Sequence, residues 1–282
     1  MKDLLGSPNA PANSEDVNNV WYYKNIQDNV NPVFEFQQRN LFTEDMIDMG
    51  TGANPCFVDY NQDGLLDIIV GNHSFYKPFG EQDPRLLLYE NIGTSKEPHF
   101  ELIDDDYLNL TDFAGSTSSL SPTFGDLDND GDLDLLIGEA GGKLLYYENS
   151  AGLGNPFAFE QVELSFMGID VGQISVPQIV DINRDGKPDL VIGERNGNLN
   201  FFENIGTTTE PMFESDEDIA PNNSFFGEVD TREFGFVTGY SSPTFLDIDG
   251  SYMLFCGSES GSIRQYTNID NNLDGALSLI HI

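Results

Sequence analysis

The sequence predicts an all-β fold, a β-propeller built from four-stranded blades, and three observations lead to this prediction. Short apolar runs of strand length recur along the chain, with turn residues between them and no apolar stripe of helical period. Two kinds of segment alternate over most of the chain. The repeating unit of about 55 to 67 residues holds four short strands, which is typical of a propeller blade. The rungs of a β-solenoid, the alternative repeat fold, are shorter.

The first kind of segment is acidic and ends in an apolar run. Its copies are FVDYNQDGLLDIIVGN (57–72), FGDLDNDGDLDLLIGE (124–139), IVDINRDGKPDLVIGE (179–194) and the shorter FLDIDGSYMLFCGSE (245–259). A proline precedes each copy, at Pro55, Pro122, Pro177 and Pro243. The runs DIIVG, DLLIG and DLVIG are short, apolar and closed by glycine, so we expect each acidic loop to lead into a strand.

The second kind of segment is an aromatic strand, then Asn, a polar turn, and Pro and Phe at the start of another strand. Its copies are YYKNIQDNVNPVFEF (22–36), LYENIGTSKEPHFE (88–101), YYENSAGLGNPFAFE (146–160) and FFENIGTTTEPMFE (201–214), with a partial fifth, QYTNIDNN (265–272). The first acidic-loop Asp precedes this Asn by 23 residues in two repeats, from Asp126 to Asn149 and from Asp181 to Asn204. The first repeat carries a nine-residue insertion, and the fourth is two residues shorter.

These repeats divide the chain into units. We expect a linker or tail over 1–20, a half-unit over 21–55, units over about 56–121, 122–176, 177–242 and 243–275, and a tail over 276–282. The final LSLIHI changes character, and this tail looks non-native. These units would supply about four to five propeller blades.

The acidic loops have the ligand pattern of a calcium site. In DLDNDGDLD, carboxylates at positions 1, 3 and 5 surround one centre, Gly at position 6 allows a sharp turn, position 7 offers its carbonyl, and position 9 adds an Asp. Hard oxygen ligands in that number suit Ca²⁺ better than Mg²⁺, which keeps more of its waters. The candidate ligands are Asp59, Asn61, Asp63, Leu65 and Asp67 in the first loop, Asp126, Asp128, Asp130, Asp132 and Asp134 in the second, and Asp181, Asn183, Asp185, Lys187 and Asp189 in the third. Leu65, Asp132 and Lys187 stand at position 7 and would bind through their backbone carbonyls, so three calcium sites are expected.

The acidic loops have two other possible interpretations. An EF-hand needs Glu at position 12, where this chain has Val70, Ile137 and Ile192, and it needs helical rather than strand flanks. An acidic hairpin turn without metal is the other alternative, since Asp-Gly is a common turn dipeptide. Three loops in register favour calcium. The fourth loop lacks positions 5 to 9, so we expect a shorter hairpin and no metal there.

The charge balance limits the classes of partner. The chain has 12 Lys and Arg against 48 Asp and Glu, a formal net charge of -36. Nucleic acid and anionic membrane surfaces are not expected as partners, because both require a basic surface. Bound cations would reduce the self-repulsion. The start of the chain has no apolar signal-peptide region and no apolar run reaches 18 residues, so membrane insertion is not expected.

The segment PTFGDLDNDGDLDLLIG (122–138), together with YENIGT (89–94), resembles the FG-GAP or VCBS repeat in its bacterial secreted form. This is the calcium-loop repeat of the integrin α-subunit propeller, and the resemblance covers about residues 20–275. It implies a propeller, commonly of seven blades, with calcium between the first two strands of a blade. It also implies an extracellular or cell-surface location, and binding on the face opposite the metal loops. Because one repeat is degenerate and one is only half present, the chain is similar to a fragment of such a ring.

Adhesion or ligand binding is the expected function, with an unidentified extracellular protein or glycan as the partner. The inserted loop NHSFYKPFGEQDPR (72–85) offers Phe75, Tyr76 and Phe79 as contact residues. The alternative for these three is a local cluster that packs the loop on its own blade. The connections around 102–118 and 215–240 are further candidate contact loops.

A structural spacer in a larger surface protein is the alternative function, and a polysaccharide lyase or glycosidase is a less favoured one. We predict no catalytic residues, because the three histidines are scattered and no G-x-S-x-G motif is present. Glu139, Glu194 and Glu259 follow equivalent strands, and this repetition favours a structural role.

Overall fold

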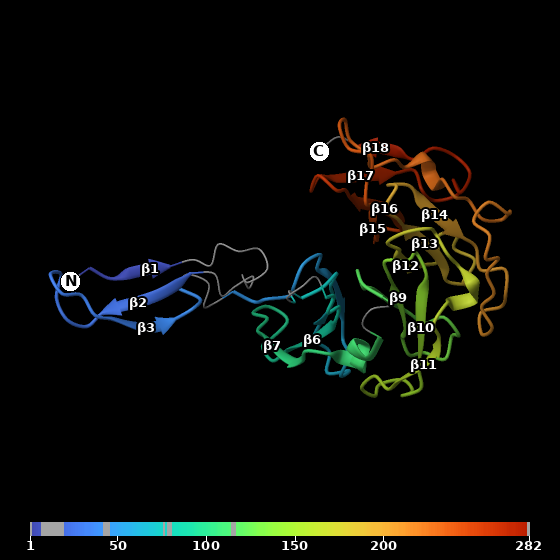
Figure 1. Ribbon diagram of the computed structural model, residues 1–282. Coiled ribbons are helices and arrows are strands. Elements are labelled where there is room, and N and C mark those ends of the chain that lie inside the picture. Colours follow the sequence, from blue (N-terminus) through green and yellow to red (C-terminus); the bar gives the residue numbers. More distant parts are fainter. Residues whose placement is uncertain are drawn as a thin grey trace.

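The computed structural model describes residues 2–6, 20–41, 46–75, 77, 81–113 and 117–280, without the side chains of 112 and 113. In these residues the chain forms five small antiparallel sheets, which confirms the all-β prediction (Figure 1). The N-terminal sheet contains β1 (Leu4–Gly6), β2 (Trp21–Asn25) and β3 (Phe34–Gln38). The first sheet contains β4 (Asn54–Val58), β5 (Asp67–Gly71), β6 (Leu86–Asn91) and β7 (Phe100–Asp104).

Three further sheets follow the same plan. The second sheet contains β8 (Ser121–Gly125), β9 (Asp134–Gly138), β10 (Leu144–Asn149) and β11 (Phe159–Glu163). The third contains β12 (Val176–Val180), β13 (Asp189–Gly193) and β14 (Leu199–Phe202), and the fourth contains β15 (Ser242–Ile248), β16 (Ser251–Gly257), β17 (Ile263–Thr267) and β18 (Ser278–Ile280). Each strand pairs with its neighbours in the chain, so every sheet is a meander, and this order is the one expected for propeller blades.

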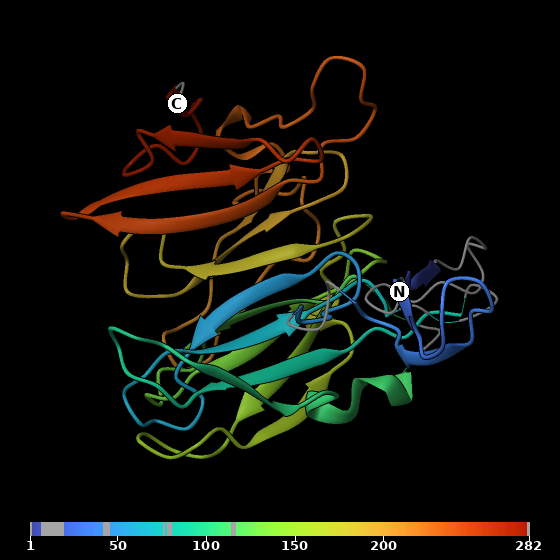
Figure 2. The same ribbon diagram turned by 90° about the vertical axis from the view of Figure 1, so that its left-hand side faces the viewer.

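The first to fourth sheets are stacked face to face (Figure 2). Their inner strands lie side by side in chain order, β4 against β8, β8 against β12, and β12 against β15. Three apolar clusters fill the spaces between consecutive sheets. In β9, Leu135 and Ile137 belong to the cluster shared with the first sheet, and Leu136 to the one shared with the third. Strands buried on both faces explain the unbroken apolar runs in the sequence.

Short 3-10 turns lead from one sheet to the next. They are η2 (Tyr107–Phe113), η3 (Phe166–Gly168) and η4 (Phe226–Glu228). Leu110, Phe166 and Phe226 each enter one of the three inter-sheet clusters from these turns. The turns therefore close the outer part of each core.

The two ends of the chain contribute strands. Residues 4–6, within the segment expected as a linker, form β1 and pair with β2. Residues 278–280, within the segment expected as a tail, form β18 and supply the edge of β17 with backbone partners. The N-terminal sheet lies apart from the others in Figure 1. Its strand β2 has the same register shift, between Tyr22 and Tyr23, as β6 and β10. It thus has the form of the outer half of a blade.

A glycine at the end of each second strand sets the distance between sheets. A Cβ atom on Gly138 would lie 2.1 Å from the carbonyl oxygen of Ser175, which belongs to the next sheet. A Cβ atom on Gly71 would likewise lie 2.2 Å from the carbonyl oxygen of Leu120, and one on Gly193 would lie 2.2 Å from that of Ser241. Backbone meets backbone at these points, so any side chain would push the sheets apart.

Gly138→Ala should therefore destabilise the fold, by about 1–3 kcal/mol or more, because the added methyl group overpacks a backbone contact. Gly257→Ala is the matched control. Gly257 ends the equivalent strand of the fourth sheet, and a Cβ atom added to it would lie 3.6 Å from the nearest atom beyond its chain neighbours, the Cβ of Ser242, which is an ordinary contact. Thermal unfolding of both variants measures the difference. Equal melting temperatures would contradict the stacking argument.

Candidate functional site

The three full acidic loops lie at equivalent places, between the first and second strands of the first, second and third sheets. Position 4 has a left-handed backbone in each loop, with φ of 60° at Gln62, 59° at Asn129 and 59° at Arg184. The glycine at position 6 is also left-handed, with φ of 88° at Gly64, 96° at Gly131 and 87° at Gly186. These two residues turn the loop sharply, which is why glycine recurs at position 6.

The carboxylate at position 1 closes each loop. The Gly131 N–H donates to Asp126 Oδ2 at 3.2 Å in the second loop. The equivalent bonds are 2.9 Å long from Gly64 to Asp59 and 2.8 Å long from Gly186 to Asp181. The three loops thus share one hydrogen-bonded fold.

The Asp at position 9 is buried and joins three segments of a sheet. Asp134 is 1% exposed, and it accepts the N–H of Leu127 at 3.2 Å and that of Asn149, at the end of β10, at 3.0 Å. Asp67 accepts from Tyr60 and Asn91 in the same way, and Asp189 accepts from Ile182 and Asn204. The position 9 carboxylate therefore ties the loop and the second strand to the third strand, in addition to the ligand role predicted for it.

The recurring Asn of the aromatic segment is a structural residue that the sequence-based search for sites missed. Asn149 Oδ1 accepts the N–H groups of Ala151 and Ala158 across the next turn, and its Nδ2 donates to the Leu133 carbonyl. Asn91 makes the same three kinds of contact in the first sheet. The signal available in the sequence was the Asn itself, which recurs after each aromatic strand although it follows the first loop Asp by 23 residues at Asn149 and by 32 at Asn91.

The second loop brings three carboxylates to one point. One oxygen from each of Asp126, Asp128 and Asp130 lies within 4.8 Å of the others. Asp126 Oδ1 is buried and has no hydrogen-bond partner. A buried carboxylate oxygen without a donor is costly, and a hard cation would satisfy it. The residues therefore fit a Ca²⁺ ion, and this is the one such group of acidic side chains among the described residues.

Asp132, at position 7 of the same loop, uses its carboxylate for a second purpose. Its Oδ2 accepts the Gly152 N–H at 2.7 Å, so the loop is joined to the turn between β10 and β11. Its Oδ1 is buried without a partner. The predicted ligand at this position is the backbone carbonyl, which stays a prediction.

The first and third loops offer fewer carboxylates. Asn61 and Asn183 occupy position 3, and the Asn61 amide donates to Asp63 Oδ2 at 3.2 Å. In the third loop, Asp185 forms an ion pair with Lys187, with 3.0 Å between Oδ2 and Nζ. Of the three calcium sites expected, only the second loop shows converging carboxylates among the described residues, and the number of sites stays a prediction.

Burial changes the acidity of the loop carboxylates. It raises the pKa of Asp134 and of Asp189 to about 7, against the lowering effect of the two backbone N–H bonds that each accepts. Burial also raises the pKa values of Asp67 and Asp128, and neighbouring carboxylates add to both shifts. Without a cation, the loops are thus crowded with charge that the protein interior disfavours.

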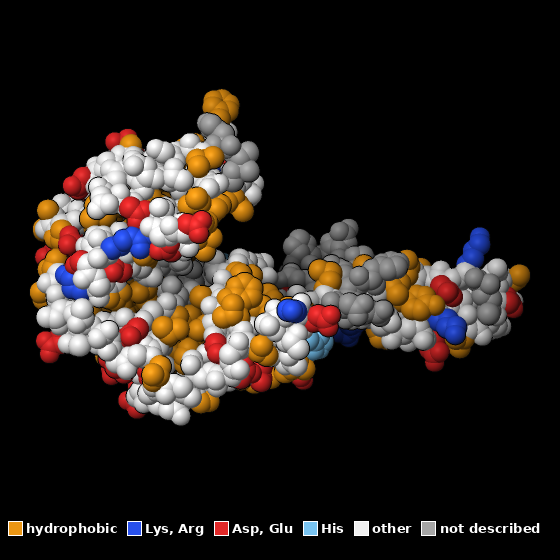
Figure 3. All heavy atoms as spheres, turned by 180° about the vertical axis from the view of Figure 1, so that it is seen from behind, with side chains coloured by type: hydrophobic (Ala, Val, Ile, Leu, Met, Phe, Trp, Pro, Cys, Tyr) orange, Lys and Arg blue, Asp and Glu red, His pale blue; other side chains and the backbone are white. Residues whose placement is uncertain are grey.

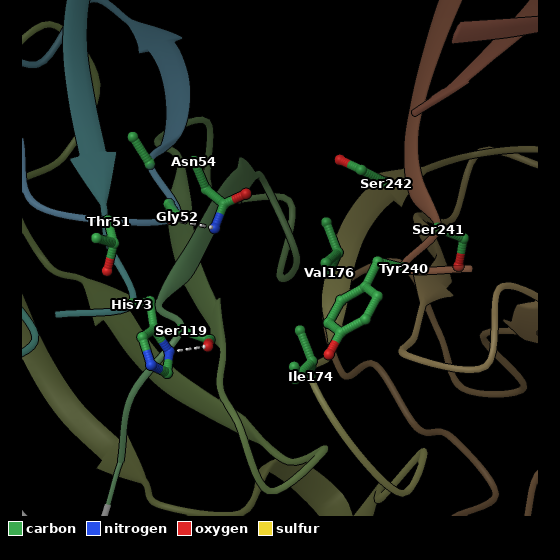
Figure 4. A pocket seen from close by; sticks show the side chains of 11 residues that line it. Thr51, Gly52, Asn54, His73, Ser119, Ile174, Val176, Tyr240, Ser241 and Ser242 are labelled. Carbon is green, nitrogen blue, oxygen red and sulfur yellow. Dashed lines mark hydrogen bonds between the residues drawn. The ribbon is translucent and has the colours of Figure 1, made fainter. Parts of the chain in front are cut away.

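A pocket of about 440 Å³ opens at the other end of the inner strands (Figure 4). Four of its lining residues each lie just before the first strand of one of four consecutive sheets, three positions before the proline of that strand. These residues are Gly52, Ser119, Ile174 and Tyr240, and all four have a left-handed backbone, with φ of 63°, 55°, 57° and 47°. The same local conformation thus places these four residues around one pocket.

The rest of the pocket lining is uncharged. Asn54 and Val176 come from β4 and β12, and His73 follows β5. His73 Nδ1 and Ser119 Oγ are 2.7 Å apart and link the first two sheets. Among the described residues that line the pocket, none is Asp, Glu, Lys or Arg. On the face shown in Figure 3, by contrast, carboxylates are widely spread.

The inserted loop contributes to its own sheet. Phe75 is half-buried against Val70, Leu87 and Tyr89, and the Arg85 guanidinium carbon lies 5.3 Å from the Phe75 ring centre. This is the local cluster that the sequence left open as the alternative to ligand contact. Tyr76 and Phe79 lie outside the described residues.

The repeated glutamates have structural roles. The Glu139 carboxylate accepts the N–H groups of Gly141 and Lys143 at 2.8 and 3.0 Å, which closes the turn between β9 and β10. Glu194 accepts the Asn196 amide at 3.0 Å at the equivalent place. Glu259 accepts the Thr238 hydroxyl. These contacts agree with the structural role favoured by their repetition.

Comparison with known proteins shows distant similarities. No protein-family model matches the chain. Integrin alpha-4 of Xenopus laevis is 29% identical over 152 residues, which cover 50% of this chain and 14% of the relative. A solved structure of an Agrocybe aegerita lectin is described as recognising non-reducing terminal N-acetylglucosamine. The alignment with it covers 99% of this chain and 62% of the lectin chain. Its sequence identity is 16% and its TM-score is 0.40. Neither relative is named as an enzyme.

The described residues contain no helix of the length and apolar character that a membrane span requires.

Without metal, the thermal stability should fall as the pH rises from about 4 to 7. The pKa of Asp134 and of Asp189 is raised from 3.8 to about 7, so the folded state holds these protons more tightly than the unfolded chain. This stabilisation is fully present below a pH of about 4 and is lost as the pH rises through about 7. Melting curves in EDTA across this range measure the effect.

The variant Asp134→Asn should flatten this pH dependence, and Glu160→Gln, which changes one exposed carboxylate on β11, should leave it in place. A melting temperature in EDTA that rises with pH would contradict the prediction.

Proposed function

We propose that the protein is a calcium-stabilised β-propeller module that binds an extracellular protein or glycan. The observation that carries the proposal is that the inner strands connect two sites. The acidic loops follow the ends of β4, β8 and β12, and the uncharged pocket lies at the beginnings of the same strands. An ion bound at the loops would fix the strands that position the pocket.

Calcium is supported by the second loop. Asp126, Asp128 and Asp130 present three converging carboxylates, and Asp126 Oδ1 is a buried acceptor that needs a positive partner. The carboxylates, backbone carbonyls and water that such a loop can present are the ligands Ca²⁺ prefers. The net charge of -36 gives any bound cation a further stabilising effect.

The pocket chemistry favours an uncharged ligand. Asn54, Ser119 and His73 offer hydrogen-bonding groups, and Ile174 and Tyr240 offer apolar surface. A few polar groups on a mainly apolar lining are typical of ligand sites. A neutral glycan, with hydroxyl groups and an apolar ring face, matches this lining. The similarity to an integrin α chain over half of this chain supports an adhesion role for the module.

We also propose that the protein works outside the cell, secreted or at the cell surface. Calcium loops of extracellular modules bind with Kd values of roughly 10⁻⁴ to 10⁻³ M. Such loops fill at extracellular calcium concentrations and stay empty in the cytosol. A structural spacer in a larger surface protein is the alternative, and a catalytic role has no support from the pocket lining.

Calcium should raise the melting temperature by several degrees relative to EDTA, because an ion that binds only the folded state stabilises it. At a concentration about 100-fold above Kd the gain is about 2.7 kcal/mol per site. The double variant Asp128→Asn/Asp130→Asn should lose most of this shift. Glu160→Gln, which removes one exposed carboxylate outside the acidic loops, is the control. An unchanged wild-type melting temperature at millimolar calcium would rule out the calcium proposal.

Binding to a glycan array in calcium, and to purified extracellular matrix proteins, tests the ligand proposal. Tyr240→Ala should remove the signal, because it deletes the largest apolar side chain of the pocket. Phe36→Ala, which changes an exposed aromatic residue in the N-terminal sheet, should not. A calcium-loaded, folded protein that binds none of these ligands would support the spacer instead.

A further inference from the structure

We propose that the protein supplies its own cations to the last two acidic hairpins. Arg184 holds the fourth hairpin in place of an ion, and Lys187 competes with calcium for the third loop. The part that concerns Lys187 rests on the proposed function, because it decides which loops take up the metal. The part that concerns Arg184 does not.

Arg184 belongs to the third loop, but its guanidinium lies against the fourth hairpin. Its Nη1 is 3.0 Å from Asp247 Oδ2, and its Nε is 2.7 Å from Asp270 Oδ1. Its Nη2 donates to the Gly250 carbonyl at 3.3 Å, and its Cζ lies 4.0 Å from the centre of the Tyr252 ring. Two carboxylates, a carbonyl and an aromatic face thus surround one positive charge.

The fourth hairpin is the one that has lost its loop. Asp247 stands at position 1, and a two-residue turn of Asp249 and Gly250 leads directly to β16. Asp247 Oδ1 accepts the Gly250 N–H at 2.9 Å, and Asp270 Oδ2 accepts the Tyr252 N–H at 2.9 Å. The remaining oxygens are too few for a calcium site, but both carboxylates still need a counter-charge. Arg184 provides it.

The backbone of the third loop directs the Arg184 side chain toward the fourth hairpin. Arg184 stands at position 4, where all three loops have a left-handed backbone. The Tyr252 hydroxyl donates to the Asp181 carbonyl at 2.9 Å, which gives the loop a second link to the fourth sheet. An isolated surface ion pair stabilises little, but here one planar group makes two ion pairs, a carbonyl bond and a ring contact.

Lys187 has a comparable position within the third loop. Its ammonium group lies 3.0 Å from Asp185 Oδ2 and donates to the Asn204 carbonyl at 2.6 Å. Asp185 is the candidate ligand at position 5, so an entering calcium ion must displace the ammonium group from it. The residues at position 7 of the other loops, Leu65 and Asp132, carry no positive charge.

The first and second loops lack such internal cations. No ion pair between the described side chains involves the acidic residues of 59–67 or 126–134. Their carboxylates therefore depend on an external ion. The second loop, which has the converging carboxylates, should be the strongest calcium site, and the third should be weaker.

Hydrogen exchange in EDTA tests the role of Arg184 independently of calcium. Arg184→Gln should speed amide exchange over residues 245–254 by roughly three- to tenfold, because Asp247 and Asp270 lose their shared counter-charge. Adding Asp247→Asn should restore part of the protection. Arg184→Lys, which keeps the charge but not the planar fork, should have an intermediate effect.

Arg232→Gln is the control, since it breaks an exposed Arg–Asp pair outside the hairpin. Exchange over 245–254 that is the same in Arg184→Gln and Arg232→Gln would overturn this part.

Calcium titration by calorimetry tests Lys187. An Asp130→Asn background weakens the second loop, so that the third loop contributes more of the signal. In this background, Lys187→Gln should bind calcium roughly three- to tenfold more tightly at the third loop, because the competing ammonium group is gone. Lys96→Gln makes the same charge change at an exposed residue and is the control. Equal affinities would overturn the role of Lys187. A wild-type chain that binds no calcium would overturn the proposed function, and the exchange experiment would still decide the role of Arg184.

Discussion

The architecture depends on a buried carboxylate at position 9 of each full acidic loop. Asp134 accepts one N–H from its own loop and one from the third strand, so a single side chain fixes the loop, the hairpin and the strand beyond it. A carboxylate in this environment is costly when ionised, and burial raises its pKa to about 7. The fold keeps this residue because its two oxygens match two backbone donors that would otherwise be unpaired.

The loop anchored by this buried carboxylate also carries a concentrated negative charge. The loop that Asp134 anchors gathers Asp126, Asp128 and Asp130, and the negative charge of this group requires a cation. The chain meets this requirement in different ways along its length. The second loop is suited to calcium, the third contains an ammonium group, and the fourth hairpin receives a guanidinium group from its neighbour. The third loop and the fourth hairpin, which offer fewer carboxylates than the second loop, thus each have a positive side chain nearby, whereas the first loop has none among the ion pairs of the described residues.

The features that depend on short stretches of sequence were predictable. The strands, the acidic hairpins and the position of Gly131 follow from spacing and turn chemistry within about ten residues, and the structure shows them as expected. The features that depend on packing were not. The terminal segments at 4–6 and 278–280 become edge strands. Their partners lie far away in the chain or are set by backbone pairing, which composition does not reveal.

The same distinction separates the two candidate sites. The calcium loop could be predicted because its ligands lie within nine consecutive residues, and their spacing alone brings them together. The pocket could not, because Gly52, Ser119, Ile174 and Tyr240 precede the first strands of four different sheets. The contact of Arg184 with Asp247 and Asp270 likewise exists only once the sheets have stacked. Stacking is decided by apolar faces and by glycines such as Gly138 that allow close approach, and only the folded chain shows which side chains it brings together.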